Sequence, residues 1–308
     1  SIERPLVART HRPTAADPGN AIASGQPGQE VRCQLVPACD RCGRIGRVDD
    51  LAVRDLERNM WSMFSIMGCG TGGRLVDTAT RLVTEAPVPQ PPYNAVLRFY
   101  DEGGRPLREQ AAELLSPMVD RGVTPVWVVH PTTDPSLRDV LTELGLVCAE
   151  EIYGMCADLA EIQPPTPRDD IEIIEFDEGS EHIWLDLVSW RYGLSDESSP
   201  YLRDVYRAGL RQGTGGLVAL VDGTPASKAV MHVADGVAGI YGVATTEAGR
   251  GKGLATHLCA TALATARAAG AERTVLHSTP MAHELYRRMG YRDVATFEMW
   301  AAPGSLHL

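Results

Sequence analysis

Residues 241–258 read YGVATTEAGRGKGLATHL and join an apolar strand pattern to a helix pattern through a turn rich in glycine. Three glycines, at positions 249, 251 and 253, alternate there with Arg250 and Lys252. A strand that leads directly into such a turn and a helix presents unpaired backbone N–H groups at the positive end of the helix dipole. This arrangement binds phosphate or pyrophosphate without any special side chain. The alternative is an ordinary solvated turn.

The segments around this turn alternate between strand and helix patterns. After the turn, residues with the three- and four-residue spacing of a half-buried helix are Leu254, Ala255, Leu258, Cys259, Ala262, Leu263 and Ala266. Before it, we expect helices at 181–193 and 201–212 and strands at 171–176, 215–223, 227–235 and 239–246. Asp222-Gly223 and Asp235-Gly236 are typical hairpin turns, so the last three strands should form an antiparallel meander. A strand at 273–278, a helix at 281–290 and a strand at 291–301 complete the pattern.

The glycine turn fits one ligand-binding signature and fails two others. It is neither Gly-x-x-x-x-Gly-Lys-Ser/Thr nor Gly-x-Gly-x-x-Gly. The order from Arg250 to Ala255, RGKGLA, fits Arg/Gln-x-x-Gly-x-Gly/Ala, and the later HSTPMAHELYRRMGY places a Tyr on a helix just before a Gly-aromatic pair. Together they resemble the GNAT superfamily of acyl-CoA-dependent N-acyltransferases over roughly Ile171 to Trp300. The resemblance implies an α/β (α+β) fold class, the GNAT fold, with a mixed, mostly antiparallel sheet flanked by helices.

The resemblance also implies which residues contact the co-substrate, acetyl-CoA or another acyl-CoA. The strand before the turn would be splayed from its neighbour and would meet the pantetheine arm at Val243, Ala244 and Thr245. The turn would wrap the pyrophosphate with the backbone of Arg250, Gly251, Lys252, Gly253, Leu254, Ala255 and Thr256. Ser278 would add a polar contact to the pantetheine, although a Ser shortly before Pro280 also suits a helix cap.

Tyr286 is the expected catalytic residue, because the resemblance places it where the family's acid protonates the departing thiolate. A phenol with a pKa of about 10 is protonated at neutral pH. A tyrosine on such a helix is also a common packing residue. Attack by an amine needs a base as well. His232, His277, Glu298 or a carboxylate acting through water are the candidates, and the implied acceptor is the amine of a small molecule.

The first half of the chain repeats the element order of the second. Gly145 lies 145 positions before Gly290, and Met155 lies 144 positions before Met299. Counting back 145 from the turn gives a proline and bulky side chains in place of glycine, at Arg105, Pro106, Arg108 and Gln110. A copy with these residues has lost the backbone approach that a phosphate requires.

The three prolines of EIQPPTPRDD mark a linker between the two copies. The sequence therefore predicts an N-terminal extension with a cysteine cluster (1–45), a degenerate GNAT-like domain (46–160), a proline-rich linker (161–170) and a catalytic GNAT domain (171–308).

Length and charge exclude several classes of function. The 308 residues carry a formal net charge of −11, which repels nucleic acid on average and favours a cationic amine. The sequence has no uncharged apolar run of about 18 residues, so no membrane span is predicted. The polar, proline-bearing start lacks a secretory signal, which predicts a cytoplasmic protein. The oligomeric state is not predicted.

The cysteines and one Met-rich segment have ordinary interpretations. The seven cysteines are scattered, and a zinc site at Cys33, Cys39 and Cys42 would need Cys69 or His11 as its fourth ligand, so no metal is predicted and free thiols are favoured. NMWSMFSIM, residues 59–67, has helical spacing and is expected to pack in the core or between domains rather than line a substrate pocket.

Two rival functions use the same fold. In one, the donor is a carrier-protein thioester or an aminoacyl-tRNA; in the other, the protein is a non-catalytic sensor that binds acyl-CoA. The acidic charge and the intact turn argue against tRNA, and the presence of Tyr286 argues against a sensor.

Overall fold

The computed structural model describes residues 48–166, 168–177 and 179–306, so the cluster of Cys33, Cys39 and Cys42 lies outside the described residues. We use "N-terminal half" for the elements α1 (Val48–Ser65), η1 (Ile66–Gly68), β1 (Arg74–Asp77), β2 (Arg81–Glu85), β3 (Ala95–Phe99), α2 (Leu107–Val119), β4 (Val126–Val129), α3 (Ser136–Glu143) and β5 (Val147–Asp158). The "C-terminal half" comprises β6 (Glu172–Glu175), α4 (Glu181–Tyr192), η2 (Asp196–Ser198), α5 (Ser199–Arg211), β7 (Thr214–Val221), β8 (Thr224–Ala234), β9 (Val237–Thr245), η3 (Glu247–Gly249), α6 (Leu254–Ala268), β10 (Arg273–Ser278), α7 (His283–Arg288) and β11 (Arg292–Ala301).

The hairpins of the C-terminal half form where the turn residues predict them. Asp222 and Gly223 have φ values of 52° and 74°, and Asp235 and Gly236 have 51° and 74°. Positive φ at both central residues is the type I′ geometry that matches the twist of the flanking strands. The predicted meander of β7, β8 and β9 is therefore confirmed.

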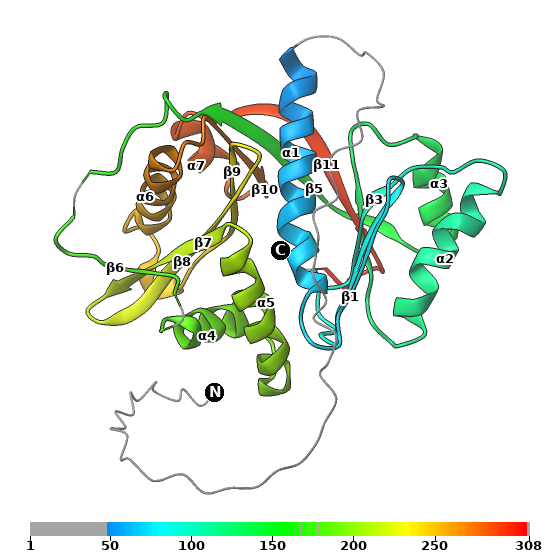
Figure 1. Cartoon of the computed structure of the whole chain (residues 1–308), viewed down its shortest axis with the longest axis horizontal. Coiled ribbons are helices and arrows are strands. Elements are labelled where there is room, and N and C mark those ends of the chain that lie inside the picture. The colour runs from blue at the N-terminus through cyan, green and yellow to red at the C-terminus, as the bar shows by residue number, and fades with distance from the viewer. Residues whose placement is uncertain (1–47, 167, 178, 307–308) are drawn as a thin grey trace, which may run out of the picture. The chain divides into compact units, whose positions relative to one another are not determined.

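The eleven strands in the described residues form one sheet, in the order β1-β2-β3-β4-β11-β5-β10-β9-β8-β7-β6 (Figure 1). Only β3 with β4 and β9 with β10 pair in parallel; the other neighbours are antiparallel. The fold is thus the predicted mixed, mostly antiparallel sheet flanked by helices.

The two halves exchange their last strands at the centre of the sheet. Strand β11 of the C-terminal half pairs with β4 and β5, while β5 of the N-terminal half pairs with β11 and β10. Strand β11 therefore lies beside β4 of the N-terminal half, and β5 lies beside β10 of the C-terminal half. The antiparallel pair of β5 and β11 forms the junction. The repeat predicted from the 145-residue offset appears in space as this near-symmetric arrangement.

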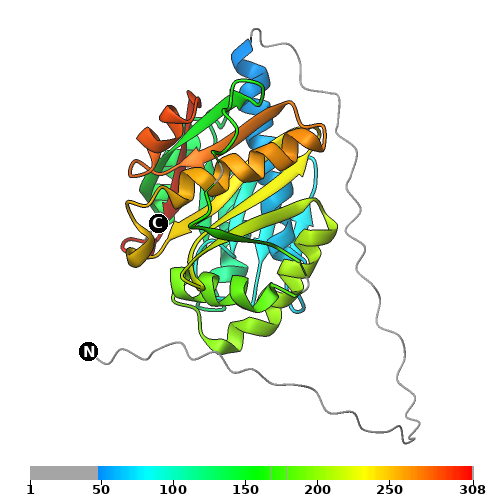
Figure 2. The same ribbon diagram turned by 90° about the vertical axis from the view of Figure 1, so that its left-hand side faces the viewer.

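Successive side chains of each strand face opposite sides of the sheet, and different helices pack on each side. On β9, Ile240 belongs to the core beneath α6 and α7, whereas the next residue, Tyr241, belongs to the core beneath α4 and α5. Helix α6 crosses β7, β8 and β9 on the face of the sheet that α7 also covers (Figure 2). None of the helices in the described part of the chain combines the length and apolar character that a bilayer span requires.

Helix α1 joins the two halves by packing on strands from both. Leu56 lies in one core with Leu97 of β3 and Val275 of β10. The buried Asn59 donates a hydrogen bond to the Val237 carbonyl oxygen at 2.9 Å and accepts one from the Tyr241 hydroxyl at 2.7 Å. An element of the N-terminal half thereby holds the strand that leads into the glycine turn.

Candidate functional site

The glycine turn between η3 and α6 has the conformation of an anion cradle. Gly251 and Gly253 have φ values of 74° and 72°, in the left-handed region that favours glycine. A Cβ on Gly251 would meet nothing within 4 Å, so the surface of the turn is open. Among the described residues, none accepts a hydrogen bond from the backbone N–H groups of residues 251–256. The backbone N–H groups of residues 251–256 are thus left without an acceptor among the described residues, at the N-terminus of a helix of 15 residues.

Gly249 has a different reason to be glycine. A Cβ there would lie 2.9 Å from the Ala226 carbonyl oxygen and 3.1 Å from Leu254 Cδ1. The residue is buried and its glycine lets the turn pack onto β8, whereas Arg250 and Lys252 are exposed.

Arg168 is a residue of the turn that the sequence did not reveal. Its guanidinium donates to the Lys252 carbonyl oxygen at 2.5 Å and forms an ion pair with Asp170. It also lies 3.7 Å from the position of a Cβ on Gly253. The proline-rich segment thus supplies a third cation to the turn. No local pattern indicates this, because the contact spans 84 residues.

Strands β9 and β10 separate from one another beyond Ile240. They pair in parallel only from Val237 with Arg273 to Ile240 with Leu276, although β9 continues to Thr245 and β10 to Ser278. The splayed strands that the resemblance implied are therefore present in the structure. The backbone of β9 beyond Ile240 has no strand partner on this side.

A β-bulge at the splay turns the backbone of β9. Lys228 of β8 pairs with Ala244, while Val230 pairs with Tyr241, so β9 contains one extra residue there. Gly242 lies in this bulge with a φ of 52°. Its carbonyl oxygen accepts a hydrogen bond from Lys228 Nζ at 2.6 Å.

A cavity that we call the channel lies at the splay. Its volume, including the open mouth, is about 1130 Å³. Four predicted contact residues line it, namely Val243, Ala244, Ser278 and Tyr286. Thr245 does not line it, because its hydroxyl pairs with the Ser227 hydroxyl at 2.8 Å. On the other side of the sheet the wall is aliphatic and comes largely from the N-terminal half, including Leu97, Val126, Val128 and Ile152.

Tyr286 lies on α7 at the wall of the channel. Its side chain is 7% exposed and packs edge-to-face on Tyr291, with ring centroids 6.0 Å apart. Burial, followed by the nearby Cys259 and Tyr291, raises the pKa of Tyr286 well above its ordinary value. The phenol therefore remains a protonated acid at neutral pH. Ser278 is buried as well, and its hydroxyl donates to the Thr279 carbonyl oxygen at 2.9 Å.

Two of the three named candidates for the base, His232 and Glu298, do not line the channel. His232 lies 2.8 Å from the Thr214 and Ser62 hydroxyls through its two ring nitrogens, and burial lowers its pKa to about 4. The carboxylate of Glu298 accepts hydrogen bonds from Arg138 and the Trp300 indole. The interactions of Arg138 and Trp300 also lower the pKa of Glu298 against the effect of burial.

His277 is the one candidate that lines the channel. Both of its ring nitrogens are buried without a hydrogen-bond partner among the described residues. Its imidazole stacks edge-to-face on Phe297, at 4.5 Å between centroids. Burial, and then His130, lower its pKa to about 3, so it is neutral at physiological pH but a weak base.

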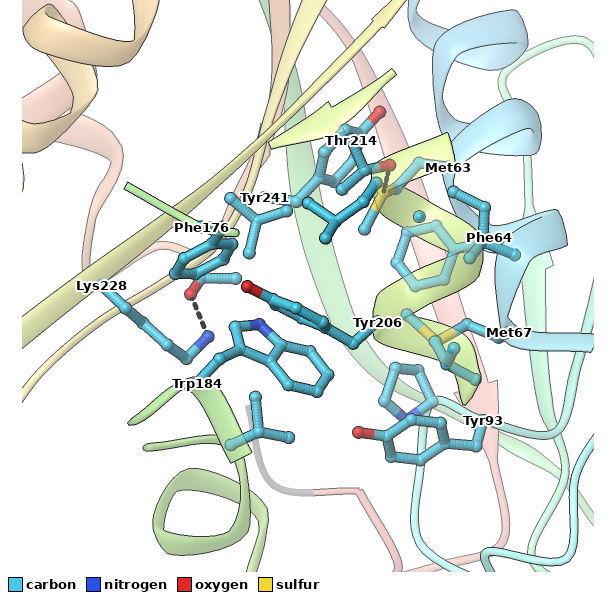
Figure 3. Close-up of a pocket in the computed structure, with 18 residues that line it drawn as sticks. Met63, Phe64, Met67, Tyr93, Phe176, Trp184, Tyr206, Thr214, Lys228 and Tyr241 are labelled. Carbon is cyan, nitrogen blue, oxygen red and sulfur yellow. Dashed lines mark hydrogen bonds between the residues drawn. The ribbon is translucent and has the colours of Figure 1, made fainter. Parts of the chain in front are cut away.

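A second cavity, which we call the aromatic cavity, adjoins the channel on the α1 face of the sheet (Figure 3). Its volume, including the open mouth, is about 760 Å³. It shares Phe64, Pro92, Tyr241 and Gly242 with the channel, so the two meet at the bulge of β9. Residues Met63, Phe64, Ile66 and Met67 line it, so the NMWSMFSIM segment borders a cavity as well as packing between the halves.

The equivalent turn of the N-terminal half is filled by its own side chains. Gln110 donates to Asp101 Oδ1 and to the Arg105 carbonyl oxygen, and accepts a hydrogen bond from the Glu102 N–H. Helix α2 then begins after Pro106, which has no N–H to offer. The Glu109 and Gln110 N–H groups donate to the Pro106 carbonyl oxygen, so fewer backbone donors are free here than in the glycine turn.

The likeness to known proteins agrees with this geometry. Residues 180–291 match the family model described as "Acetyltransferase (GNAT) family", a span that includes the glycine turn, the splayed strands and Tyr286. This span is a GNAT domain. No curated protein has a sequence significantly similar to the chain.

Solved structures extend the likeness of the GNAT domain across both halves. A GCN5-related N-acetyltransferase from Kribbella flavida is 19% identical, with a TM-score of 0.57 over 82% of this chain and 96% of that one. A tandem GNAT protein from the clavulanic acid biosynthesis pathway is 13% identical, with a TM-score of 0.56 over 83% and 95%. An N-acetyltransferase from Sphaerobacter thermophilus is 18% identical, with a TM-score of 0.53 over 76% and 84%. At such identities the likeness shows the fold.

No group of three or more His, Cys, Asp or Glu side chains in the described ranges is placed to hold a metal ion. The groups described for the GNAT domain are the backbone N–H donors of residues 251–256 and the Tyr286 phenol, which lines the channel.

Proposed function

We propose that this protein transfers an acyl group, most simply acetyl, from coenzyme A to the amine of a small molecule. The observation that carries the proposal is the channel: it lies where β9 and β10 separate, and Tyr286, Ser278 and the bulge of β9 line it together. A thioester arm needs such a passage, and the glycine turn with its unpaired N–H groups lies at the end of β9.

Each group of the site has a role in this proposal. The N–H groups from Gly251 to Thr256 bind the pyrophosphate, and Arg250, Lys252 and Arg168 add positive charge. The free edge of β9 at Val243 and Ala244 pairs with the pantetheine arm, and Ser278 adds a polar contact. Thr245 contributes backbone only, since its hydroxyl pairs with Ser227.

The chemistry is direct attack by a neutral amine on the thioester carbonyl. The bond from nitrogen to the acyl carbon forms and the bond from that carbon to sulfur breaks. The nitrogen then releases one proton to water, and the Tyr286 hydroxyl supplies one to the thiolate. Burial raises the pKa of Tyr286, so the phenol holds a proton at neutral pH that it can give to the thiolate as sulfur departs. A backbone N–H of the bulge polarises the carbonyl.

We assign the catalytic machinery to residues 171–308 and the scaffold to residues 46–160, joined by the segment 161–170. The turn before α2 has Pro106 in place of a glycine, and two of its N–H groups donate to the Pro106 carbonyl oxygen, which supports a single cofactor site per chain. The aliphatic wall that β3, β4 and β5 contribute to the channel gives the N-terminal half a part in the site without a cofactor of its own.

A thiol-release assay with acetyl-CoA and a panel of amines tests the proposal. We expect coenzyme A to raise the melting temperature and at least one amine to release thiol with formation of the amide. Absence of both the thermal shift and the thiol would reject the proposed function, whereas binding without turnover on any amine would favour the sensor.

Replacing a glycine of the turn tests the cofactor site. Gly251→Ala should weaken coenzyme A binding at least tenfold, because the left-handed backbone that exposes the donors is strained by a Cβ. Gly223→Ala is the matched control, since Gly223 has the same φ of 74° and equally open surroundings but lies in a hairpin. Calorimetric titration should show a loss of affinity in the first variant and none in the second. Equal affinities would remove the turn from the site.

A further inference from the structure

The aromatic cavity contains one charged side chain that the proposed transfer does not use. Lys228 lines the cavity, is 2% exposed and donates a single hydrogen bond, to the Gly242 carbonyl oxygen. No carboxylate of a described residue lies within 4 Å of its ammonium group. The chain has two lysines, and the other, Lys252, is exposed. A buried cation is costly unless an anion or further acceptors compensate it.

The charges around Lys228 are positive, although the net charge of the whole chain is negative. Burial, and then the positive charge of Arg191 on α4, lower the pKa of Lys228 to about 8. Arg191 itself lines the adjoining channel. Other polar groups nearby are already engaged, since Tyr206 donates to the Asp177 carbonyl oxygen and Tyr241 to Asn59. A ligand with a negative group is favoured here, and the cationic acceptor expected from the net charge of −11 is not.

The two ends of the aromatic cavity differ in polarity. Figure 3 shows Lys228 at one end and Met63, Phe64 and Met67 at the other, with the ring of Trp184 between them. The remaining lining is mainly aliphatic and aromatic, and polyhydroxylated or polycationic acceptors find few partners there. An acceptor for this space has an apolar body with its charge at one end.

The position of Lys228 also sets where the charge lies relative to the reacting nitrogen. The ammonium group is 2.6 Å from the carbonyl oxygen of Gly242, and Gly242 is shared by the aromatic cavity and the channel. An anion bound by Lys228 therefore lies near Gly242, where the two cavities meet. An acceptor whose anion and attacked amine are separated by only one or two carbon atoms fits this arrangement.

We propose that the acceptor is a hydrophobic amino acid whose carboxylate pairs with Lys228, whose amine faces the bulge at Gly242 and whose side chain lies toward Met63 and Met67. The proposal rests on the proposed function and adds the substrate class to it. Lys228 is a binding and positioning residue, and the bonds formed and broken are those of the acyl transfer already described.

Matched acceptors separate the carboxylate from the rest of the molecule. With acetyl-CoA, phenylalanine should have a kcat/KM at least tenfold above those of phenylalaninamide and 2-phenylethylamine, which have the ring and the amine without the carboxylate. Glycine, which has the carboxylate without the apolar body, should also be at least tenfold worse. 3-Phenylpropanoate, which has no amine, should compete with phenylalanine.

Lys228→Met keeps the length and apolar packing of the side chain and removes its charge. We expect a rise of at least tenfold in the KM for phenylalanine, loss of inhibition by 3-phenylpropanoate, and a change of less than threefold for 2-phenylethylamine. Arg203→Met is the control for loss of a positive charge, because Arg203 is an exposed α5 residue paired with Glu181. It should leave all four acceptors unchanged. An unaltered thermal shift with coenzyme A would show that each variant is folded.

Two results would overturn the inference while leaving the proposed function intact. One is turnover on other amines with no preference for phenylalanine over 2-phenylethylamine. The other is an equal loss on every acceptor in Lys228→Met, which would make the lysine a proton-transfer or packing residue. Failure of coenzyme A to bind would instead reject the proposed function itself. Binding of 3-phenylpropanoate, followed by its thermal shift in the wild type and Lys228→Met, tests the anion site without turnover.

Discussion

At the scale of single residues, burial shifts the pKa of Tyr286 and the pKa of Lys228 in opposite directions. Tyr286 is buried beside Cys259 and Tyr291, and its pKa is raised. Lys228 is buried beside Arg191, and its pKa is lowered to about 8. Both shifts have desolvation as the largest cause, because burial disfavours whichever form is charged. The phenol is thereby kept as an acid, while the lysine is left as a cation that a ligand can stabilise.

Removing the Tyr286 hydroxyl tests the acid. Tyr286→Phe should lower kcat by about a hundredfold to ten-thousandfold, since general acid catalysis contributes on the order of 10²–10⁴. Coenzyme A binding should be nearly unchanged. Tyr291→Phe is the matched control, because Tyr291 packs on Tyr286 but its hydroxyl pairs with Thr274 instead of lining the channel. Steady-state kinetics with calorimetric binding would remove Tyr286 from the acid role if turnover and binding fell together.

The buried lysine makes stability depend on pH in a direction that can be stated. The folded pKa of Lys228 is about 8, below the unfolded value near 10.5. Between these values the unfolded chain binds more protons, so the stability of the wild type rises with pH across this window. Relative to Lys228→Met, the wild type should gain about 3 kcal/mol from below pH 8 to pH 10.5. Urea unfolding of both proteins at several pH values measures the difference, and parallel pH profiles would contradict it.

At the scale of elements, β9 is the strand on which the site depends. Its first part pairs with β10 and is covered by α1, while its second part is free beyond Ile240 and leads to the turn. Gly239 marks the point where α1 comes closest. A Cβ there would lie 1.9 Å from Asn59 Oδ1 and 2.5 Å from Tyr241 Cε2. Helix α1 and β9 can approach this closely only because position 239 has no side chain.

Filling that contact should separate α1 from β9. Gly239→Ala should lower the free energy of unfolding by about 2–3 kcal/mol, because the added methyl overpacks the contact and displaces the Asn59 amide. Gly215→Ala on β7 is the control, since a Cβ there meets nothing within 4 Å. Its stability should change by less than about 0.5 kcal/mol, as at an unhindered site. Equal unfolding midpoints for the two variants would mean that α1 adapts to the methyl at no cost.

At the scale of the whole molecule, the exchange of β5 and β11 makes the two halves depend on each other. The strand partners of β11 are β4 and β5, both in the N-terminal half. Without that half, β11 has no strand to pair with and β10 has one unpaired edge. Burial of the central core, which includes Leu56, Val275 and Phe297, would be lost as well.

Separating the halves tests this dependence. Residues 161–308 expressed alone should unfold without a cooperative transition and should not bind coenzyme A. A full chain cleaved at a protease site inserted after the exposed Pro164 should stay assembled and keep its affinity. The two experiments differ only in whether the N-terminal half is present. A cooperatively folded 161–308 fragment with full affinity for coenzyme A would show that the exchange is dispensable.

Much of the site's chemistry could be predicted from the sequence, because it is local in the chain. The spacing of Gly251 and Gly253 before the helix at Leu254 gave the cradle, and their φ values agree with it. The same reasoning did not find Arg168 or Lys228. Arg168 reaches the turn from 84 residues away, and Lys228 occupies an alternating strand where one buried cation has no local signature.

By itself, the sequence determined the elements, the hairpins, the glycine turn and the existence of two related halves, since each depends on the conformational preferences of neighbouring residues. Only the tertiary structure decided that the last strands are exchanged, that α1 lines the aromatic cavity, and that Glu298 is held by Arg138 outside either cavity. The physical reason is that these outcomes depend on which distant edges and faces pair. The periodicity of one strand is the same whichever neighbour it joins.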